Sequence, residues 1–183
     1  MDTQTEEPIV RIRMSLEDYL ELPDDVKAEW VRGETLIMTL PKFLHQIILT
    51  RLIILLNTAL AGCLIVPEAG LRMISSRRRP DIMVVDEWPQ DETWVDDPPL
   101  VVIEIISPST RNEDMIRKLV EYLAAGVKQY WILDPQYRRI TILHNLSGQW
   151  GNETVLDDDH RTAEVVVGMH GNVKLNIDEL FAP

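Results

Sequence analysis

Two acidic residues and one lysine in this chain are spaced so that they could form a hydrolytic site. Asp81 follows Pro80 just before an apolar run, and Glu104 is the one acidic residue in the apolar run 100–106. A buried carboxylate is costly unless it is paired or binds a cation. Together with Lys118, which follows on the next predicted helix, they indicate a divalent-metal site that cuts phosphodiester bonds.

A strand is expected over residues 100–106, and its alternation decides which way Glu104 points. Glu104 shares one face with Val102 and Ile106, and both faces are otherwise apolar. This pattern suits a strand that is covered on both sides. Metal ligation is the favoured reading of Glu104, because Asp81 is expected to begin the adjacent strand and Mg²⁺ takes one or two carboxylates. A glutamate paired with arginine or lysine and an ordinary turn aspartate stay open as alternatives.

A helix is expected over residues 112–125, ending at Gly126. Lys118 lies at the margin of its expected buried stripe, from where its side chain could reach inward and present the amine near Glu104. Asp114 lies one turn earlier and could pair with the same amine. The stripe consists of Met115, Leu119, Tyr122 and Leu123. A solvated lysine is the alternative.

The remaining elements predict an α/β (α+β) sandwich with a mixed sheet. Short helices are expected after Ser15 and over residues 24–31, and a long helix over residues 45–61. We predict a loose arm at residues 1–13 and a single domain at 14–183. Further strands are expected over residues 35–40, 63–66, 71–75, 82–85, 129–133, 139–143, 164–167 and 173–175.

Composition bounds the class of protein. At 183 residues with 45% hydrophobic residues, the chain can bury the core of one domain. The single Cys63 excludes an internal disulfide and fits a reducing compartment. No signal peptide or membrane span is visible, so we expect a cytoplasmic protein. A homodimer is plausible, since the Trp-bearing loop 86–99 and the tail strands could cover a sheet edge.

The charge distribution counts against non-specific nucleic-acid coating but leaves local binding open. The formal net charge is −12, whereas phosphate backbones attract basic surfaces. Arg77, Arg78 and Arg79 stand next to Asp81 and are predicted to contact flanking phosphates. A second basic set consists of Arg111, Arg117, Lys118, Arg138 and Arg139. The alternative for each cluster is a solvated face.

The spacing of these residues resembles a known family. The run Arg-Pro-Asp, then Val-Ile-Glu-Ile-Ile-Ser-Pro-Ser-Thr, then Asp-x₃-Lys-x₃-Tyr-x₃-Gly-Val-x-x-Tyr-Trp-x-x-Asp-Pro resembles the Uma-two family of restriction-endonuclease-like proteins. That family belongs to the PD-(D/E)xK nuclease superfamily, and the resemblance covers about residues 14–180. It implies a restriction-endonuclease-like core, a mixed central β-sheet flanked by helices, and an Mg²⁺ or Mn²⁺ cofactor.

The resemblance also implies roles for single residues. Asp81 and Glu104 would be metal ligands, with the main-chain carbonyl of Ile105 as a third. Glu34, after Gly33, matches the superfamily's additional N-terminal acid and would be catalytic. The superfamily's lysine stands two residues after the glutamate, where this chain has Ile106; here it has moved to Lys118. The supporting residues would be His45 and Tyr122.

The resulting expectation is a metal-dependent endonuclease acting on nucleic acid, with DNA favoured over RNA. Asp81 and Glu104 would hold the metal, and Lys118 would orient the attacking water or stabilise developing charge. The alternative is a catalytically inactive module that binds nucleic acid or a protein partner, which the acidic charge and the displaced lysine favour. A glycosidase with paired acids is a weaker third reading, because no aromatic sugar platform is evident near them.

Overall fold

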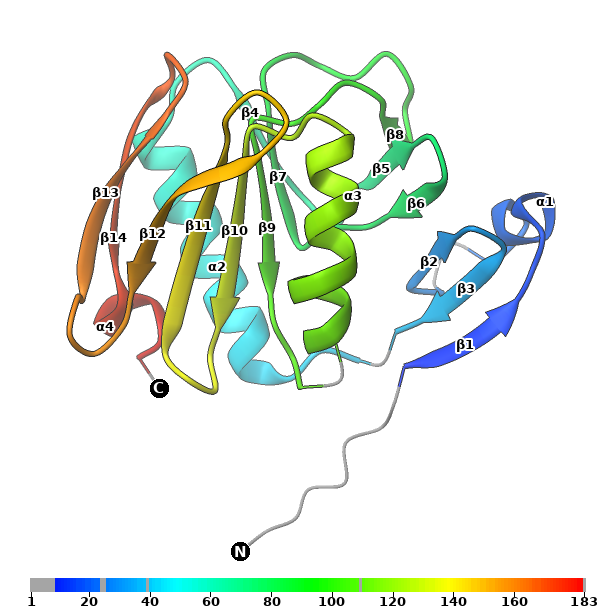
Figure 1. The fold of residues 1–183 in the computed structure, drawn as a ribbon, viewed down its shortest axis with the longest axis horizontal. Helices are drawn as coiled ribbons and strands as arrows, with labels where there is room; N and C mark the ends of the chain where they lie inside the picture. Colours follow the sequence, from blue (N-terminus) through cyan, green and yellow to red (C-terminus); the bar gives the residue numbers. More distant parts are fainter. Residues whose placement is uncertain (1–8, 24–25, 39, 109, 183) are drawn as a thin grey trace, which may run out of the picture.

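A six-stranded mixed sheet forms the centre of the molecule (Figure 1). The structure, a computed structural model, describes residues 9–23, 26–38, 40–108 and 110–182. Neighbouring strands in this sheet are antiparallel except for the parallel pair β9–β10. The strands, in spatial order, are β12 (Trp150–Leu156), β11 (Arg139–Asn145), β10 (Gln129–Asp134), β9 (Val101–Ile105), β7 (Ile82–Val85) and β4 (Leu64–Pro67).

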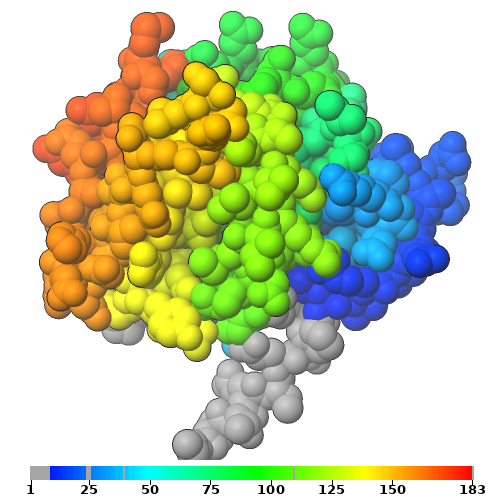
Figure 2. All heavy atoms as spheres, viewed as in Figure 1, coloured from blue at the N-terminus to red at the C-terminus, as the bar shows by residue number. Residues whose placement is uncertain are grey.

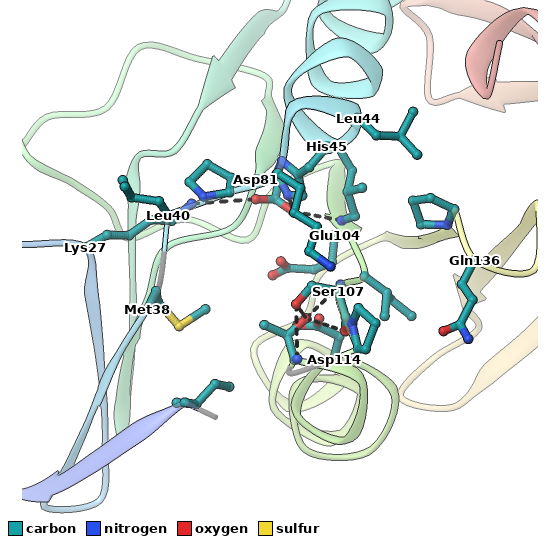
Figure 3. Close-up of a pocket in the computed structure, with 18 of the residues that line it drawn as sticks. Lys27, Met38, Leu40, Leu44, His45, Asp81, Glu104, Ser107, Asp114 and Gln136 are labelled. Carbon is teal, nitrogen blue, oxygen red and sulfur yellow. Dashed lines mark hydrogen bonds and ion pairs between the residues drawn. The ribbon is translucent and has the colours of Figure 1, made fainter. Parts of the chain in front are cut away.

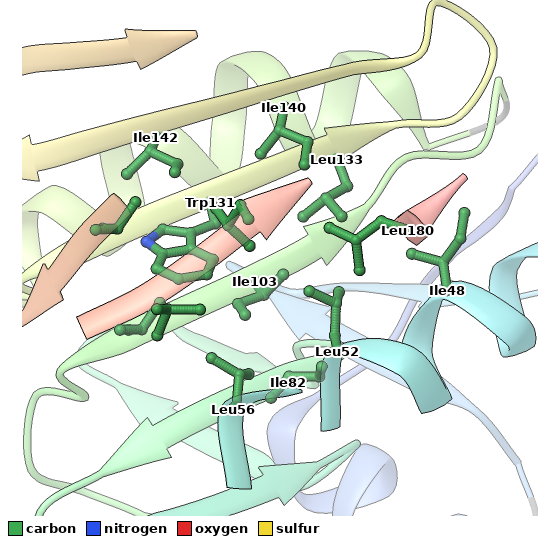
Figure 4. Packing of buried hydrophobic residues seen from close by; sticks show 14 of the residues in the cluster. Ile48, Leu52, Leu56, Ile82, Ile103, Trp131, Leu133, Ile140, Ile142 and Leu180 are labelled. Carbon is green, nitrogen blue, oxygen red and sulfur yellow. The ribbon is translucent and has the colours of Figure 1, made fainter. Parts of the chain in front are cut away.

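Helices cover both faces of this sheet, as Figure 1 shows. Helix α2 (Phe43–Ala59) packs on one face, and the π-helical turn η1 (Glu113–Arg117) continues into α3 (Lys118–Ala124) on the other. Strand β9 therefore feeds two apolar clusters. Val101, Ile103 and Ile105 join the α2 cluster, in which Figure 4 labels Ile103, and the residues between them point toward α3. The predicted two-sided strand with Glu104 facing α3 is confirmed.

A second sheet packs beside the first and carries the N-terminal part of the chain. Its order is β1-β3-β2-β6-β5-β8, with α1 (Leu16–Leu20) following β1. The strands are β1 (Val10–Arg13), β2 (Ala28–Val31), β3 (Glu34–Ile37), β5 (Gly70–Met73), β6 (Ser76–Arg78) and β8 (Trp94–Val95). At the other end of the molecule lie the hairpin β13 (Thr162–Val167) and β14 (Gly171–Asn176) and the short helix α4 (Ile177–Leu180).

Two expectations for the N-terminal region were wrong. Of the helix predicted over 24–31, residues 24–25 lie outside the described part of the chain, and residues 28–31 form β2, which is joined to β3 by a two-residue turn at Arg32 and Gly33. Both turn residues have positive φ, 50° and 88°, as a tight hairpin turn requires. The predicted arm is ordered at residues 10–13, because β1 pairs along the whole of β3. Residues 1–8 lie outside the described part of the chain.

Other elements differ from the predictions only in extent or were missed. Helix α2 begins two residues earlier than predicted and ends at Ala59, because Leu60 is already extended. Strands β6, β8 and β12 and helix α4 were not predicted. Strand β8 lies within the predicted loop 86–99, and β12 has mixed burial without a clean alternation. Among the described residues, no helix combines the length and apolar character needed to cross a membrane.

Candidate active site

One cavity of about 380 Å³ gathers the residues singled out in the sequence. It opens where β7 and β9 meet the first turn of α2 and the start of η1–α3, and Asp81, Glu104 and Lys118 all line it. The register pairs Ile82 with Ile103, so one further step sets Asp81 level with Glu104. In Figure 3 Asp81, Glu104 and Asp114 follow one another through the middle of the cavity. The predicted convergence of two acids and a lysine is present in the structure.

Asp81 is held as a carboxylate by donors on three sides. The main-chain N–H of Ile105 donates to its Oδ2 at 2.7 Å, and Nε2 of His45 lies 3.2 Å from the same oxygen. Nζ of Lys27 lies 3.9 Å from Oδ1. Burial alone would raise the pKa of Asp81, but His45, the Ile105 N–H and Lys27 together lower it. Asp81 is therefore ionised and available as an oxygen ligand at neutral pH.

The pKa of Glu104 is shifted in the opposite direction from that of Asp81. Nζ of Lys118 donates to its Oε1 at 2.9 Å, and the hydroxyl of Tyr122 donates to the same oxygen at 2.6 Å. Burial raises the pKa of Glu104 to about 8, Lys118 opposes that rise, and the nearby carboxylates Asp114 and Asp81 add to it. Its second oxygen, Oε2, has no hydrogen-bond partner among the described residues. The positive charge of Lys118 is thus too small to offset the burial of Glu104 and the repulsion from its acidic neighbours.

Lys118 is fully enclosed by acids. Its side chain is 1% exposed, and its Nζ lies 2.9 Å from Glu104, 3.1 Å from Asp114 and 3.3 Å from Glu29. Burial alone would lower the pKa of Lys118, but these carboxylates raise it well above its ordinary value. The amine therefore stays charged, and the predicted pairing with Asp114 is confirmed.

The buried stripe of this helix differs from the predicted one. Asp114, Lys118 and Tyr122 form its inner face, whereas Met115 is 44% exposed. The cause is the π-helical turn: the N–H of Lys118 bonds to the carbonyl of Glu113, five residues back instead of four. This wider turn rotates Lys118 from the margin to the centre of the inner face. Such turns recur at functional sites.

Glu34 does not belong to this site, contrary to the sequence prediction. Its side chain is 48% exposed and lies 3.9 Å from Arg11, in a different groove of the surface. It follows the hairpin turn, and the strand alternation turns it away from the cavity. Glu29, on the paired strand β2, is the N-terminal acid that reaches Lys118. Glu29 was not predicted as a site residue, because a helix was expected over this part of the chain. The hairpin signal was Arg32-Gly33 between two short runs rich in aromatic and β-branched residues.

The three arginines before Asp81 have three different environments. Arg78 was predicted to contact phosphate, which is wrong: its side chain is fully buried and pairs with Glu29, Glu113 and Glu121 at 2.7–3.0 Å. Arg77 lies over the Trp94 ring, with its Cζ 5.8 Å from the centroid. Arg79 lines the cavity. Phosphate contact by Arg77 and Arg79 stays a prediction.

A model of the Uma2 family, described as "Putative restriction endonuclease", matches residues 16–176. The chain belongs to the Uma2 family. It is also similar to a solved structure from Anabaena variabilis ATCC 29413, titled "a putative nuclease belonging to DUF820", with a TM-score of 0.74 and 20% identity. The match covers 92% of this chain and 98% of the other, which shows a shared fold. No curated protein matches the chain.

The Uma2 site offers oxygen ligands that fit a hard divalent cation. Asp81 is ionised, and Glu104 presents an unpartnered carboxylate oxygen in the same cavity, with the main chain of Ile105 beside them. Within the described ranges, no three His, Cys, Asp or Glu side chains form a ready metal-binding group. Mg²⁺ commonly binds through one or two carboxylates and completes its shell with water and substrate phosphate. The two acids therefore suffice for a cation of this type.

The raised pKa of Glu104 predicts how metal-free stability depends on pH. The folded protein holds this proton more tightly than the unfolded chain, whose glutamate has an ordinary pKa of 4.5. The contribution to stability is thus complete below pH 4.5 and is lost as pH rises through about 8. We expect the free energy of unfolding in EDTA, measured by urea titration, to fall across this window.

The variant Glu104→Gln isolates this effect, because it keeps the shape and cannot titrate. The difference in unfolding free energy between wild type and variant should change with pH by at most about 1.4 kcal/mol per unit. Asp114, whose pKa burial also raises, contributes a residual slope of the same sign in both proteins. A difference that is flat between pH 5 and 8 would contradict the assignment.

Proposed function

We propose that this Uma2 protein is a metal-dependent endonuclease that hydrolyses phosphodiester bonds in nucleic acid, with DNA as its substrate. The observation that carries the proposal is the meeting of an ionised aspartate, an under-compensated buried glutamate and a charged lysine in one cavity. Apolar side chains could satisfy the fold at these positions without the cost of burying charge. A cation and a phosphate account for the arrangement.

Asp81, Glu104 and the carbonyl of Ile105 would hold the divalent ion, Mg²⁺ or Mn²⁺. When bound, such an ion supplies Lewis acidity and positive charge beside the scissile phosphate. His45 and the Ile105 N–H both contact Oδ2 of Asp81, which fixes the carboxylate and leaves Oδ1 directed toward the cavity side occupied by Lys27. Tyr122 fixes Glu104 through Oε1 in the same way.

Lys118 provides the fixed positive charge of the mechanism. Three carboxylates hold its ammonium group in place, so no reorganisation is needed when negative charge develops on the phosphate. Its raised pKa excludes a role as general base at neutral pH. Lys118 therefore acts as a hydrogen-bond donor that orients water or stabilises charge.

Basic side chains around the cavity give the phosphate a path to these groups. Lys27, Lys42 and Arg79 line its wall. Lys27 already bridges Asp81 and Glu68, with 2.6 Å to the latter. We propose that these residues neutralise the phosphates that flank the scissile bond.

A second candidate is a non-cleaving module that binds nucleic acid or a protein. The observation that favours it is that Lys118 already neutralises part of the acidic cluster, which lessens the need for a metal ion. This reading predicts binding without turnover under every metal condition.

The test is a cleavage assay with supercoiled plasmid, linear duplex, single-stranded DNA and RNA, each with Mg²⁺, Mn²⁺ or EDTA. Cutting that requires the metal supports the proposal, and preference for DNA over RNA supports the substrate. Binding by gel shift with no cutting in any condition supports the module instead. Homodimerisation and a cytoplasmic location stay predictions from the sequence; light scattering after gel filtration tests the first.

A further inference from the structure

A second groove lies on the opposite side of η1–α3 from the cavity. It has a volume of about 660 Å³ and runs between the β2–β3 turn and the outer face of the helix. Figure 2 shows these two parts side by side, the turn in blue and the helix in green. The groove is lined by Arg13, Val31, Arg32, Gly33, Glu34, Ile116, Arg117, Val120 and Glu121.

The groove has surplus positive charge. Among the residues that the structure describes, no acidic side chain pairs with Arg13 or Arg32, and both are exposed. Arg117 has only a loose contact with Glu113 at 3.5 Å and is 53% exposed. Of the two lining acids, Glu121 is already bonded to buried Arg78 at 2.8 Å, and Glu34 lies 3.9 Å from Arg11, so three arginines face two acids that already have a basic neighbour. A basic groove is notable in a chain of net charge −12.

The backbone conformation at Arg32 does not require an arginine side chain. Its φ is 50°, in the left-handed region that a side chain other than Asn, Asp or Gly adopts at a cost. Two-residue turns of this kind prefer Asn-Gly or Asp-Gly. Arginine is not needed for the turn, so its long cationic side chain is not explained by the fold.

We infer that this groove binds the phosphate backbone of nucleic acid outside the catalytic cavity. The inference rests on the proposed function and explains how an acidic protein can hold a polyanion. Arginine suits phosphate because its guanidinium presents a planar fork of donors. The helix links the two sites, since η1–α3 carries Lys118 on its inner face and Arg117 on its outer face. One strand passing the end of the helix could therefore contact both.

The test measures DNA binding by fluorescence anisotropy in EDTA, where cleavage is suppressed, over a range of salt concentrations. The variant Arg32→Asn/Arg117→Gln removes two charges, and asparagine suits the turn, so folding is preserved. We expect about tenfold weaker binding near 0.15 M salt and a salt slope reduced by about 2. The control Lys128→Gln/Arg139→Gln removes the same charge from exposed positions outside the groove and should change neither.

If DNA binding weakens equally in the variant and in the control, the groove is not a DNA-binding site. The proposed nuclease activity would not be affected by that result. Polyglutamate that binds the wild type as tightly as DNA, and loses affinity in the groove variant, would overturn DNA binding at the groove in favour of an acidic protein partner.

Discussion

Replacing Asp81 with asparagine is expected to reduce metal-dependent cleavage by at least about 100-fold, because the loss of a metal ligand removes several kcal/mol of charge stabilisation in the transition state. Asparagine keeps the size of the side chain, and its carbonyl oxygen can still accept the N–H of Ile105. The fold should therefore persist. Single-turnover cleavage of plasmid in Mn²⁺ measures the effect, and thermal unfolding of the same sample checks the fold.

Glu34→Gln is the matched control for this experiment. It removes the acid that the sequence placed in the site and that the structure places 3.9 Å from Arg11, outside the cavity. At saturating DNA its rate should stay within about twofold of wild type, since the residue is exposed and lies outside the catalytic cavity. A loss of cleavage rate equal to that of Asp81→Asn would show that Glu34 has a catalytic role after all. Full activity of both variants would show that Asp81 is not a ligand of the catalytic metal ion.

The contrast between these two acids shows what the sequence can specify. Asp81 and Glu104 lie side by side as predicted, because strand alternation has a period of two and each lies at or near the end of an apolar strand. Glu34 was placed by resemblance alone, and a strand mistaken for a helix hid the true neighbour, Glu29. The turn that separates them depends on positive φ at Arg32, a residue type that rarely signals such a turn.

Long-range charge pairing was the part that sequence patterns could not show. Arg78 looked like a member of an exposed basic run, yet its partners lie 35 to 49 residues away along the chain. The position of Lys118 also depends on a single π-helical turn, which shifts the inner face without any change in the apolar pattern. Both cases depend on tertiary packing, because acids from separate elements meet only in the folded chain.

Replacing Lys118 with methionine is expected to lower the free energy of unfolding by about 3–5 kcal/mol near pH 8, the usual cost of removing one partner from a buried ion pair. Methionine has a similar length, so the loss comes from the charge rather than from a cavity. Glu104 and Asp114 would be left buried without their nearest cation, while Glu29 keeps Arg78. Urea unfolding in EDTA measures the change, with exposed Lys128→Met as the control.

The pH dependence of this loss identifies its cause. Burial already raises the pKa of Glu104 to about 8 and also raises that of Asp114. Without the lysine both acids take up protons more readily, so the penalty should shrink as the pH falls toward 5. The double variant Lys118→Met/Glu104→Gln should recover much of the loss at pH 8, because it removes one buried charge. A loss below about 1 kcal/mol at every pH, typical of exposed pairs, would mean that the amine lies in solvent and that the three residues share no site.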